Sequence, residues 1–417
     1  MLTFDLSIIF SLFDLNMSGK IRVNMICHEF TQHNNRGVLT MRMSFNMNKI
    51  FISIVFSALI VCVFVQQAFC TGKIITDQII SNALKDNKLG DPNTRNMVIY
   101  LPPSYDSSDK YYPVVYLLHG FGGNERSYID TVTENLMVPL LDGFIESRTF
   151  KEMILVMPDA SNKYGGSYYL NSELIGNYED YIVKEIVNQM DTKYRTIPDR
   201  DGRVIAGASM GGYGSITLAM KHPDVFSAVA ALSPPLSFEI MMESIIPEII
   251  KENPNGMTGP DSNKQYSDYI YALSAALSPN LDNPPFFVDL PFEYPTGKVI
   301  EPIRQKWLKQ DPMTMLIAYS PSLKAMKGIY IDVGDKDLLG FKTAADEFNK
   351  KLLDLGIVPK YEPFIGGHSD NGVLRAISAL TYLSSFLPDA GYPSAIEYKG
   401  KLTSTWGAIK SPFPLGE

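Results

Sequence analysis

The sequence predicts an α/β fold in which a mostly parallel central sheet carries helices on both faces. Short apolar runs closed by proline or glycine, typical of strands, alternate along the chain with amphipathic segments typical of helices. Several of these runs are almost continuously aliphatic, as expected of strands that are covered on both faces. Such alternation favours parallel strands joined by crossover helices.

The predicted elements occupy residues 71–390, which we expect to form one domain. The strands are 96–102, 112–120, 153–159, 203–209, 228–234, 328–334 and, with a weaker pattern, 361–367. The helices, where apolar residues recur at helical spacing, are 174–192, 212–221, 343–355 and 373–386. The tail at 391–417 carries no pattern that we can assign.

Residues 236–320 interrupt the alternation and are rich in Pro, Asn and Met. Helix-like pieces lie at 238–251 and 302–310. Because connections this long are usually functional or disordered, we expect an inserted cap or substrate-binding segment. Its aromatic residues either line a pocket or fill the insertion's own small core; they are Phe286, Phe287, Phe292, Tyr294 and Trp307.

The stretch at 47–70 has the layout of a secretory signal peptide. Lys49 comes first, an uncharged apolar run of 16 residues follows at 50–65, and small residues stand at Ala68 and Cys70. The run is shorter than the roughly 18 residues of a membrane span, and a membrane anchor is the alternative. We therefore expect a secreted or periplasmic protein, with membrane attachment only if Cys70 carries a lipid.

Residues 1–46 precede this segment, whereas a signal peptide normally begins the chain. Our hypothesis is that translation starts at Met47 or Met43 and that 1–46 is a non-native extension. Removal of residues 1–70 leaves no cysteine in the chain. We then expect no disulfide, no thiolate metal site and no cysteine nucleophile.

The charge and the histidine content narrow the function classes further. The net charge of −8 and the lack of a Lys/Arg run argue against binding of nucleic acid. Beyond residue 70 the histidines are His119, His222 and His368, and no His-x-x-x-His pair occurs, which argues against zinc. We expect neither a metal nor an organic cofactor.

The motif GASMGGYGS (207–215) places Ser209 between a predicted strand and a predicted helix. This strand–turn–helix context is what a nucleophile elbow requires. Gly207 and Gly211 suit it because a side chain at either place would strike the adjoining strand or helix. A phosphate-binding loop would need a lysine that the motif lacks.

A serine nucleophile needs a base and an acid that orients the base. His368 suits the role of base, because it lies on a loop between a predicted strand and the last helix. His119 at a strand end and His222 at a helix end suit structural roles better. The order Ser, then Asp, then His is the chain order of α/β-hydrolases.

The acid comes from the segment IDVGDKDLLG (331–340). Asp332 lies inside the predicted strand, whereas Asp335 and Asp337 lie on the loop after it. We predict Asp337 as the acid.

Two backbone N–H groups are needed to bind the oxyanion. We assign one to Met210, directly after the nucleophile. The other is assigned to Phe121, in the glycine-rich loop HGFGG (119–123) after an early strand.

At these positions the sequence resembles the esterase D-type family of α/β-hydrolases, which includes feruloyl and enterochelin-type esterases, S-formylglutathione hydrolases and mycolyltransferase antigens. The resemblance implies the α/β-hydrolase fold, the triad and oxyanion residues assigned above, and catalysis without a cofactor. It depends on the segments VIYLPPSYD (98–106), YPVVYLLHGFGG (112–123), GASMGGYGS (207–215), VGDKDLL (333–339) and GGHSD (366–370).

The main prediction is an exported serine carboxylic-ester hydrolase that acts through an acyl-enzyme on a small-molecule or carbohydrate-linked ester, such as an acylated carbohydrate or a siderophore. An acyltransferase that delivers the same acyl group to a sugar or lipid hydroxyl is one alternative. A non-catalytic binding module on this scaffold is another.

Overall fold

The computed structural model describes residues 14–15, 21–28, 38–45, 71–131, 134–261 and 263–392. The chain divides into two compact units, Met1–Phe69 and Cys70–Glu417. The first contains an antiparallel sheet of β1 (Asp14–Leu15), β2 (Ile21–His28) and β3 (Val38–Phe45). The predicted signal peptide at 47–70, Cys70 included, and the tail from 393 onward lie outside the described residues. Within the described ranges, no helix is both long enough and apolar enough to cross a membrane.

The second unit is built around an eight-stranded sheet in the order β15-β14-β11-β10-β6-β7-β5-β4. Strand β5 runs antiparallel to both of its neighbours, and all other pairs are parallel. The strands are β4 (Lys73–Ile80), β5 (Thr94–Leu101), β6 (Val114–Leu118), β7 (Ile154–Pro158), β10 (Arg203–Ala208), β11 (Ala228–Leu232), β14 (Gly328–Gly334) and β15 (Lys360–Phe364).

All seven predicted strands are therefore confirmed. The edge strand β4 was not predicted, because the polar residues Thr76, Asp77 and Gln78 interrupt its apolar pattern. Two further hairpins lie outside this sheet, β8 (Asn171–Ser172) with β9 (Gly176–Asn177) and β12 (Phe292–Glu293) with β13 (Lys298–Val299).

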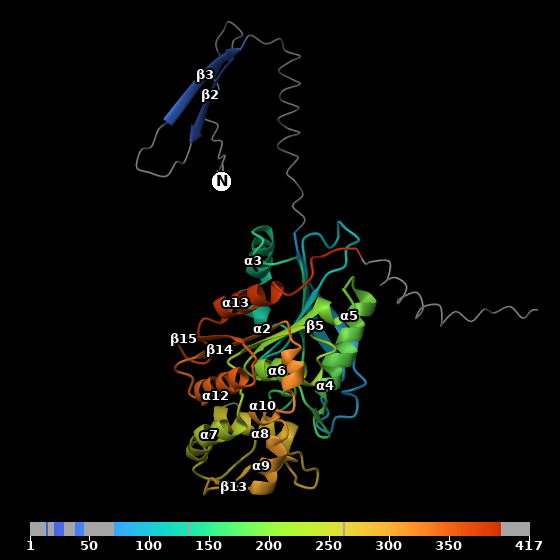
Figure 1. Cartoon of the computed structure of the whole chain (residues 1–417), viewed down its shortest axis with the longest axis vertical. Coiled ribbons are helices and arrows are strands. Elements are labelled where there is room, and N and C mark those ends of the chain that lie inside the picture. Colours follow the sequence, from blue (N-terminus) through green and yellow to red (C-terminus); the bar gives the residue numbers. More distant parts are fainter. Residues whose placement is uncertain are drawn as a thin grey trace, which may run out of the picture. The chain divides into compact units, whose positions relative to one another are not determined.

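Helices cover both faces of the sheet (Figure 1). One face carries α2 (Ser127–Asp130), α3 (Glu134–Glu146) and α13 (Gly372–Ser384). The other carries α4 (Tyr178–Asp180), the π-helical turn η1 (Tyr181–Ile186), α5 (Val187–Lys193), α6 (Met210–Lys221) and α12 (Phe341–Asp354), and a 3₁₀ turn, η2 (Arg200–Gly202), precedes β10. The predicted helix at 174–192 begins only at Tyr178, because residues 176–177 pair in β9.

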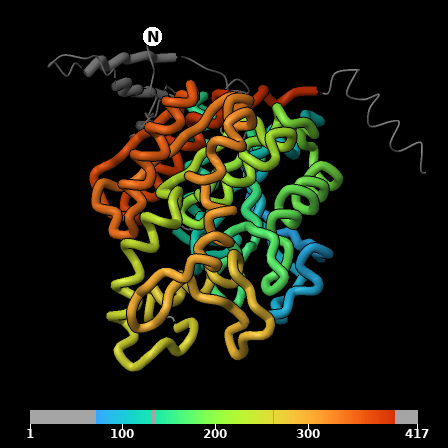
Figure 2. The backbone as a smooth tube through the Cα atoms, turned by 60° about the horizontal axis from the view of Figure 1, so that its bottom comes forward, coloured from blue at the N-terminus to red at the C-terminus, as the bar shows by residue number. Residues whose placement is uncertain are grey.

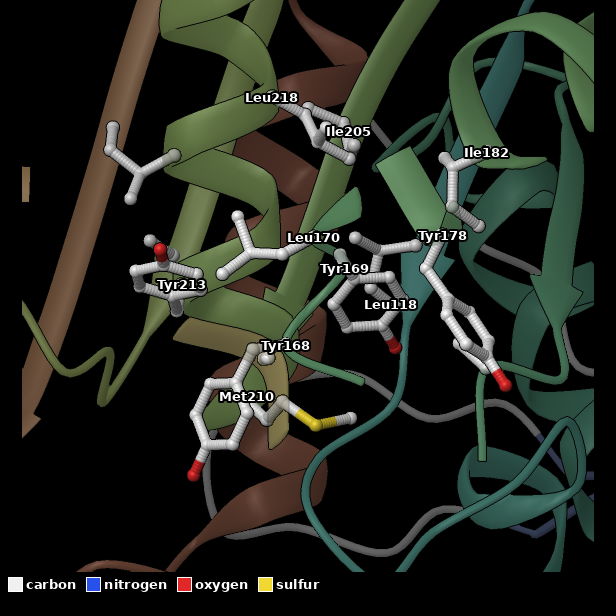
Figure 3. Close-up of a cluster of buried hydrophobic side chains, with 14 of the residues drawn as sticks. Leu118, Tyr168, Tyr169, Leu170, Tyr178, Ile182, Ile205, Met210, Tyr213 and Leu218 are labelled. Atoms are coloured by element: carbon white, nitrogen blue, oxygen red, sulfur yellow. The ribbon is translucent and has the colours of Figure 1, made fainter. Parts of the chain in front are cut away.

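The core between β6 and α6 is rich in aromatic side chains (Figure 3). The ring of Tyr169 lies so close to α6 that a Cβ on Gly214 would be 2.4 Å from it. The Tyr169 hydroxyl donates a hydrogen bond of 2.8 Å to the carbonyl of His119, at the end of β6. Through its ring and its hydroxyl, Tyr169 therefore links α6 to the loop after β6.

Residues 236–320 form a layer of their own, seen at the bottom of Figure 1 and in yellow and orange in Figure 2. Trp307 is fully buried there, donates to Ser278 Oγ at 2.9 Å and packs edge-on against Phe238. Phe286 is partly exposed and borders a groove of about 480 Å³. The predicted insertion thus has its own core and a groove. Its helices are α7 (Phe238–Glu252), α8 (Gln265–Leu277), α9 (Glu301–Leu308) and α10 (Pro312–Met315), and α11 (Ser320–Lys324) begins at its last residue.

Candidate active site

Ser209 stands on the sharp turn between β10 and α6. Its backbone has φ 56° and ψ −118°, in the left-handed half of the Ramachandran plot that non-glycine residues rarely occupy. The surroundings enforce this conformation: the Ser209 N–H donates to the Leu232 carbonyl at 2.8 Å, and the Tyr213 N–H donates to the Ser209 carbonyl at 2.9 Å. The side chain is thereby lifted clear of the sheet at its carboxyl edge, as a nucleophile elbow requires.

Two glycines make this turn possible. A Cβ on Gly207 would lie 2.4 Å from the carbonyl oxygen of Gly211. A Cβ on Gly211 would lie 2.0 Å from the carbonyl oxygen of Leu118 on the neighbouring strand β6. Both contacts are far shorter than any real Cβ makes, and each involves backbone that cannot yield. The physical reason predicted for these glycines is confirmed.

The structure brings Ser209, His368 and Asp337 together. Ser209 Oγ lies 2.9 Å from His368 Nε2, and His368 Nδ1 lies 2.7 Å from Asp337 Oδ2. The other carboxylate oxygen of Asp337 accepts the Leu339 N–H at 3.0 Å. The Asp337 side chain is 0% exposed and the His368 side chain is 23% exposed. The acid is therefore shielded from solvent, whereas the base can be reached from solvent. The three residues follow strands β10, β15 and β14, whose carboxyl ends share one edge of the sheet.

The other two histidines beyond residue 70 are engaged elsewhere. His119 is buried, with Nε2 accepting the Ala160 N–H at 2.9 Å and Nδ1 bonded to the Gly120 carbonyl at 2.8 Å. Its Nδ1 therefore carries the proton, and burial lowers the pKa of His119. His119 braces the start of the oxyanion loop.

His222 lies at the end of α6 and bonds Glu179 at 2.8 Å. Burial raises the pKa of Glu179, but its bonds to His222 and Lys221 outweigh that effect and lower it to about 2. This cluster is structural, because it lies at the opposite end of α6 from Ser209.

The two rejected aspartates also have structural partners. Asp335 Oδ1 accepts the Gly366 N–H at 2.9 Å and so ties the aspartate loop to the histidine loop. Asp332 lies within β14, is buried and pairs with Arg375.

The predicted oxyanion donors lie next to this triad. Gly120, directly before Phe121, lies close to Ser209, since a Cβ on Gly120 would be 3.6 Å from Ser209 Cβ. Among the residues that the structure describes, neither the Phe121 N–H nor the Met210 N–H has a hydrogen-bond acceptor. The Met210 N–H also begins α6, so the helix dipole adds positive potential there. Two such amides are what an oxyanion hole requires.

The loop that follows β7 was not predicted to belong to the site, but it packs against both donor residues. Its Gly165 carbonyl accepts the Gly122 N–H at 2.7 Å, and a Cβ on Gly165 would lie 2.6 Å from the Phe121 ring. A Cβ on Gly166 would lie 2.3 Å from the sulfur of Met210. The two glycines let this backbone lie directly against the side chains of the donor residues.

Asn162 organises that loop, and the insertion adds a second contact. Asn162 Oδ1 accepts the Tyr164 N–H at 2.9 Å and also the Gly166 N–H. Asn162 Nδ2 donates to the Gly166 carbonyl. The Tyr164 hydroxyl reaches the Phe286 carbonyl in the insertion at 2.8 Å. The Tyr269 ring from α8 packs edge-on against Phe121, with centroids 4.7 Å apart. The oxyanion loop is therefore fixed from two sides.

Arg375 is a second part of the site that sequence reasoning missed. Its guanidinium makes two bonds to Asp332, at 2.7 and 2.9 Å, and one to Ser233 Oγ at 2.7 Å. It also donates to the His368 carbonyl at 3.0 Å. A buried cation thus anchors the backbone of the candidate base. Its position one turn into the last helix, seven residues after His368, was the available signal.

Comparisons with known proteins identify the family to which the chain belongs. A family model described as "Putative esterase" matches residues 91–369. Over 143 residues the chain is 32% identical to Esterase Rv1288 of Mycobacterium tuberculosis. The aligned segment covers 33% of this chain and 29% of that protein. Over 142 residues it is 29% identical to an endo-1,4-beta-xylanase/feruloyl esterase of Xylanibacter ruminicola, covering 32% and 19%. The matched segments span less than a third of either relative's length.

The fold has a solved counterpart. The structure of a ferulic acid esterase superposes with a TM-score of 0.53 at 22% sequence identity, covering 76% of this chain and 100% of that one. The predicted α/β-hydrolase fold is confirmed.

Proposed function

Because this chain belongs to the Esterase family through residues 91–369, we propose that it is a serine carboxylic-ester hydrolase that works through an acyl-enzyme. One observation carries the proposal: Ser209 Oγ, His368 Nε2 and Asp337 Oδ2 are joined by contacts of 2.9 and 2.7 Å beside two amide N–H groups that have no acceptor among the described residues. The esterase names of the curated relatives support the same reaction class.

The proton transfers follow from the hydrogen bonds. His368 Nε2 takes the proton of Ser209 as Oγ bonds to the ester carbonyl carbon, and it then gives that proton to the leaving alkoxide. In deacylation, His368 takes a proton from water as the water oxygen attacks the acyl carbon. The bond between that carbon and Ser209 Oγ then breaks, Oγ regains the proton from His368, and the carboxylic acid leaves. Asp337 holds the Nδ1–H throughout, and its own second oxygen is fixed by the Leu339 N–H. General-base catalysis of this kind contributes about 100- to 10,000-fold.

The amides of Phe121 and Met210 would bind the carbonyl oxygen as it becomes negative. Each such donor is worth about 100- to 1,000-fold in kcat, because it is already oriented before the charge develops. The loop after β7 and Tyr269 hold Phe121 in place, so the donor geometry costs no reorganisation at the moment of reaction.

The test compares Ser209→Ala with the unchanged protein on p-nitrophenyl acetate. We expect a loss of at least about 1,000-fold in kcat with the thermal unfolding midpoint retained, because loss of a triad nucleophile removes most of the catalysis. Asn371→Ser serves as the control: this exposed residue also has a positive φ, of 57°, but lies outside the triad. Retention of full activity in Ser209→Ala would refute the mechanism. A new ester formed with glycerol as acceptor would instead identify an acyltransferase.

We further propose that the protein is exported, on the strength of the segment at 47–70 and of a cysteine-free remainder after residue 70. Fractionation of cells that express the full gene, with N-terminal sequencing of the product, tests this. A mature chain that starts near residue 71 outside the cytosol is expected, and an intact cytosolic product would refute export.

A further inference from the structure

A cavity of about 240 Å³ lies between the sheet and the helices α2, α3 and α13, on the opposite face from α6. We call it the α3–α13 cavity. Protein interiors are packed as densely as organic crystals and leave few voids larger than a water molecule, so a space of this size is not ordinary core. Its wall is mainly aliphatic and includes Leu117, Met137, Leu140, Leu141, Leu155 and Ile377.

Each polar side chain in this wall already has a hydrogen-bond partner within the protein. The Tyr128 hydroxyl and Thr131 Oγ1 each donate to a backbone carbonyl, at 2.9 and 2.8 Å, and Ser127 Oγ accepts a backbone N–H at 2.9 Å. Both ring nitrogens of His119 are bonded to backbone groups, and Arg375 is bonded to Asp332, Ser233 and backbone carbonyls. A ligand hydroxyl buried here would have to share or displace these hydrogen bonds, whereas an apolar chain would not.

The cavity lies next to the candidate nucleophile. The wall of the cavity includes Gly120, which lies close to Ser209 in space, and Ala208, which precedes Ser209 in the sequence. The exposed wall residues Thr131 and Gly372 place its opening between the end of α2 and the start of α13. Gly372 is four residues after His368, so the opening is at the same edge of the sheet as the triad.

We propose that the α3–α13 cavity binds a linear hydrocarbon chain. An aliphatic cavity of about 150 Å³ binds benzene, which has six carbons, so by proportion 240 Å³ suits a chain of roughly eight to ten carbons. The chain belongs either to the acyl group of the substrate or to a separate amphiphile, and the two arms of the experiment distinguish these sources. Only the kinetic arm rests on the proposed function.

The binding arm uses the Ser209→Ala protein and calorimetric titration with hexanoate, octanoate and 4-hydroxycinnamate. Each methylene buried strengthens binding about fourfold, so octanoate should bind about 15-fold more tightly than hexanoate. The hydroxycinnamate, of similar carbon count, should bind more weakly than octanoate because burial of its phenol in a mainly aliphatic wall is costly. Leu140→Trp, which fills the cavity, should raise the octanoate Kd at least about tenfold.

Leu136→Trp is the matched control, because Leu136 is on the same helix, is 63% exposed and lies outside the cavity wall. Ile377→Trp fills the cavity from the opposite wall, so the result does not depend on one variant. Both filling variants are checked for folding by their circular dichroism melting curves.

The kinetic arm compares p-nitrophenyl octanoate with p-nitrophenyl acetate. If the chain is the acyl group, Leu140→Trp lowers kcat/KM for the octanoate at least about tenfold and spares the acetate. If it belongs to a separate amphiphile, both esters are spared while octanoate binding is lost. The proposal is overturned if octanoate does not bind, or if its Kd is unchanged in folded Leu140→Trp and Ile377→Trp. An inactive wild type would refute the hydrolase assignment and leave the binding result standing.

Discussion

The pairing of Arg375 with Asp332 should affect stability and activity separately. The two side chains are 9% and 1% exposed, and the guanidinium also holds the His368 carbonyl at 3.0 Å. Arg375→Met removes the cation and leaves the Asp332 carboxylate buried without its partner. Arg375→Met with Asp332→Leu removes both charges and leaves the Ser233 N–H bonded to the carbonyl of residue 332.

The magnitudes follow from that geometry. Breaking a buried ion pair by removing one partner costs about 3–5 kcal/mol, whereas replacing both partners by apolar residues is often neutral or stabilising. We expect the single variant to lose about 3–5 kcal/mol of unfolding free energy and the double variant to recover most of it. Activity should not recover with it, because the tether to His368 is absent from both variants. A displacement of about 1 Å at a catalytic group costs on the order of 100-fold.

Denaturant unfolding and kcat with p-nitrophenyl acetate measure the two quantities on the same preparations. Recovery of stability without recovery of kcat supports a positioning role for Arg375. If kcat recovered in parallel with stability, Arg375 would be a purely structural residue, and if stability did not recover, the ion-pair reasoning itself would be wrong.

Three more outcomes follow from single contacts. Gly165→Ala should lower kcat about 10- to 100-fold by displacing Phe121, whereas Gly256→Ala, equally strained at φ 106° but with nothing within 4 Å, should leave kcat unchanged. Gly211→Ala should abolish the folded state or cost more than about 4 kcal/mol, measured by soluble yield and denaturant unfolding. The pKa of Glu179 is depressed to about 2 in the fold. Its contribution to the free energy of unfolding is therefore complete above the pKa that it has in the unfolded chain, and is lost as pH falls towards 2. Glu179→Gln should therefore be less stable than wild type by about 2–3 kcal/mol at pH 7, with the gap closing by pH 2, and a gap independent of pH would contradict this.

The parts of the fold that the sequence predicted are those whose causes are local. The seven strands are short aliphatic runs with clear ends, and the Ser209 turn is encoded within nine residues, 207–215. Asp337 and His368 could be selected because each follows a parallel strand, and the carboxyl ends of such strands meet at one edge.

The missed parts depend on packing between distant segments. Helix α8 is buried along most of its length, so its sequence has no polar face to mark it as amphipathic. Helix α3 carries Pro139, which argues against a helix in the sequence but is accommodated in the structure. The role of Gly165 depends on Phe121, and that of Arg375 on Ser233, which is 142 residues away. A local sequence pattern cannot predict contacts between residues so far apart in the chain.

The most direct test of the account is the site at which a fluorophosphonate reacts. The wild-type protein should gain one phosphonyl group, and tryptic mass spectrometry should place it on the peptide that contains Ser209, with labelling abolished in His368→Ala. Labelling of another serine, or equal labelling after the histidine is removed, would show that these three side chains do not work together.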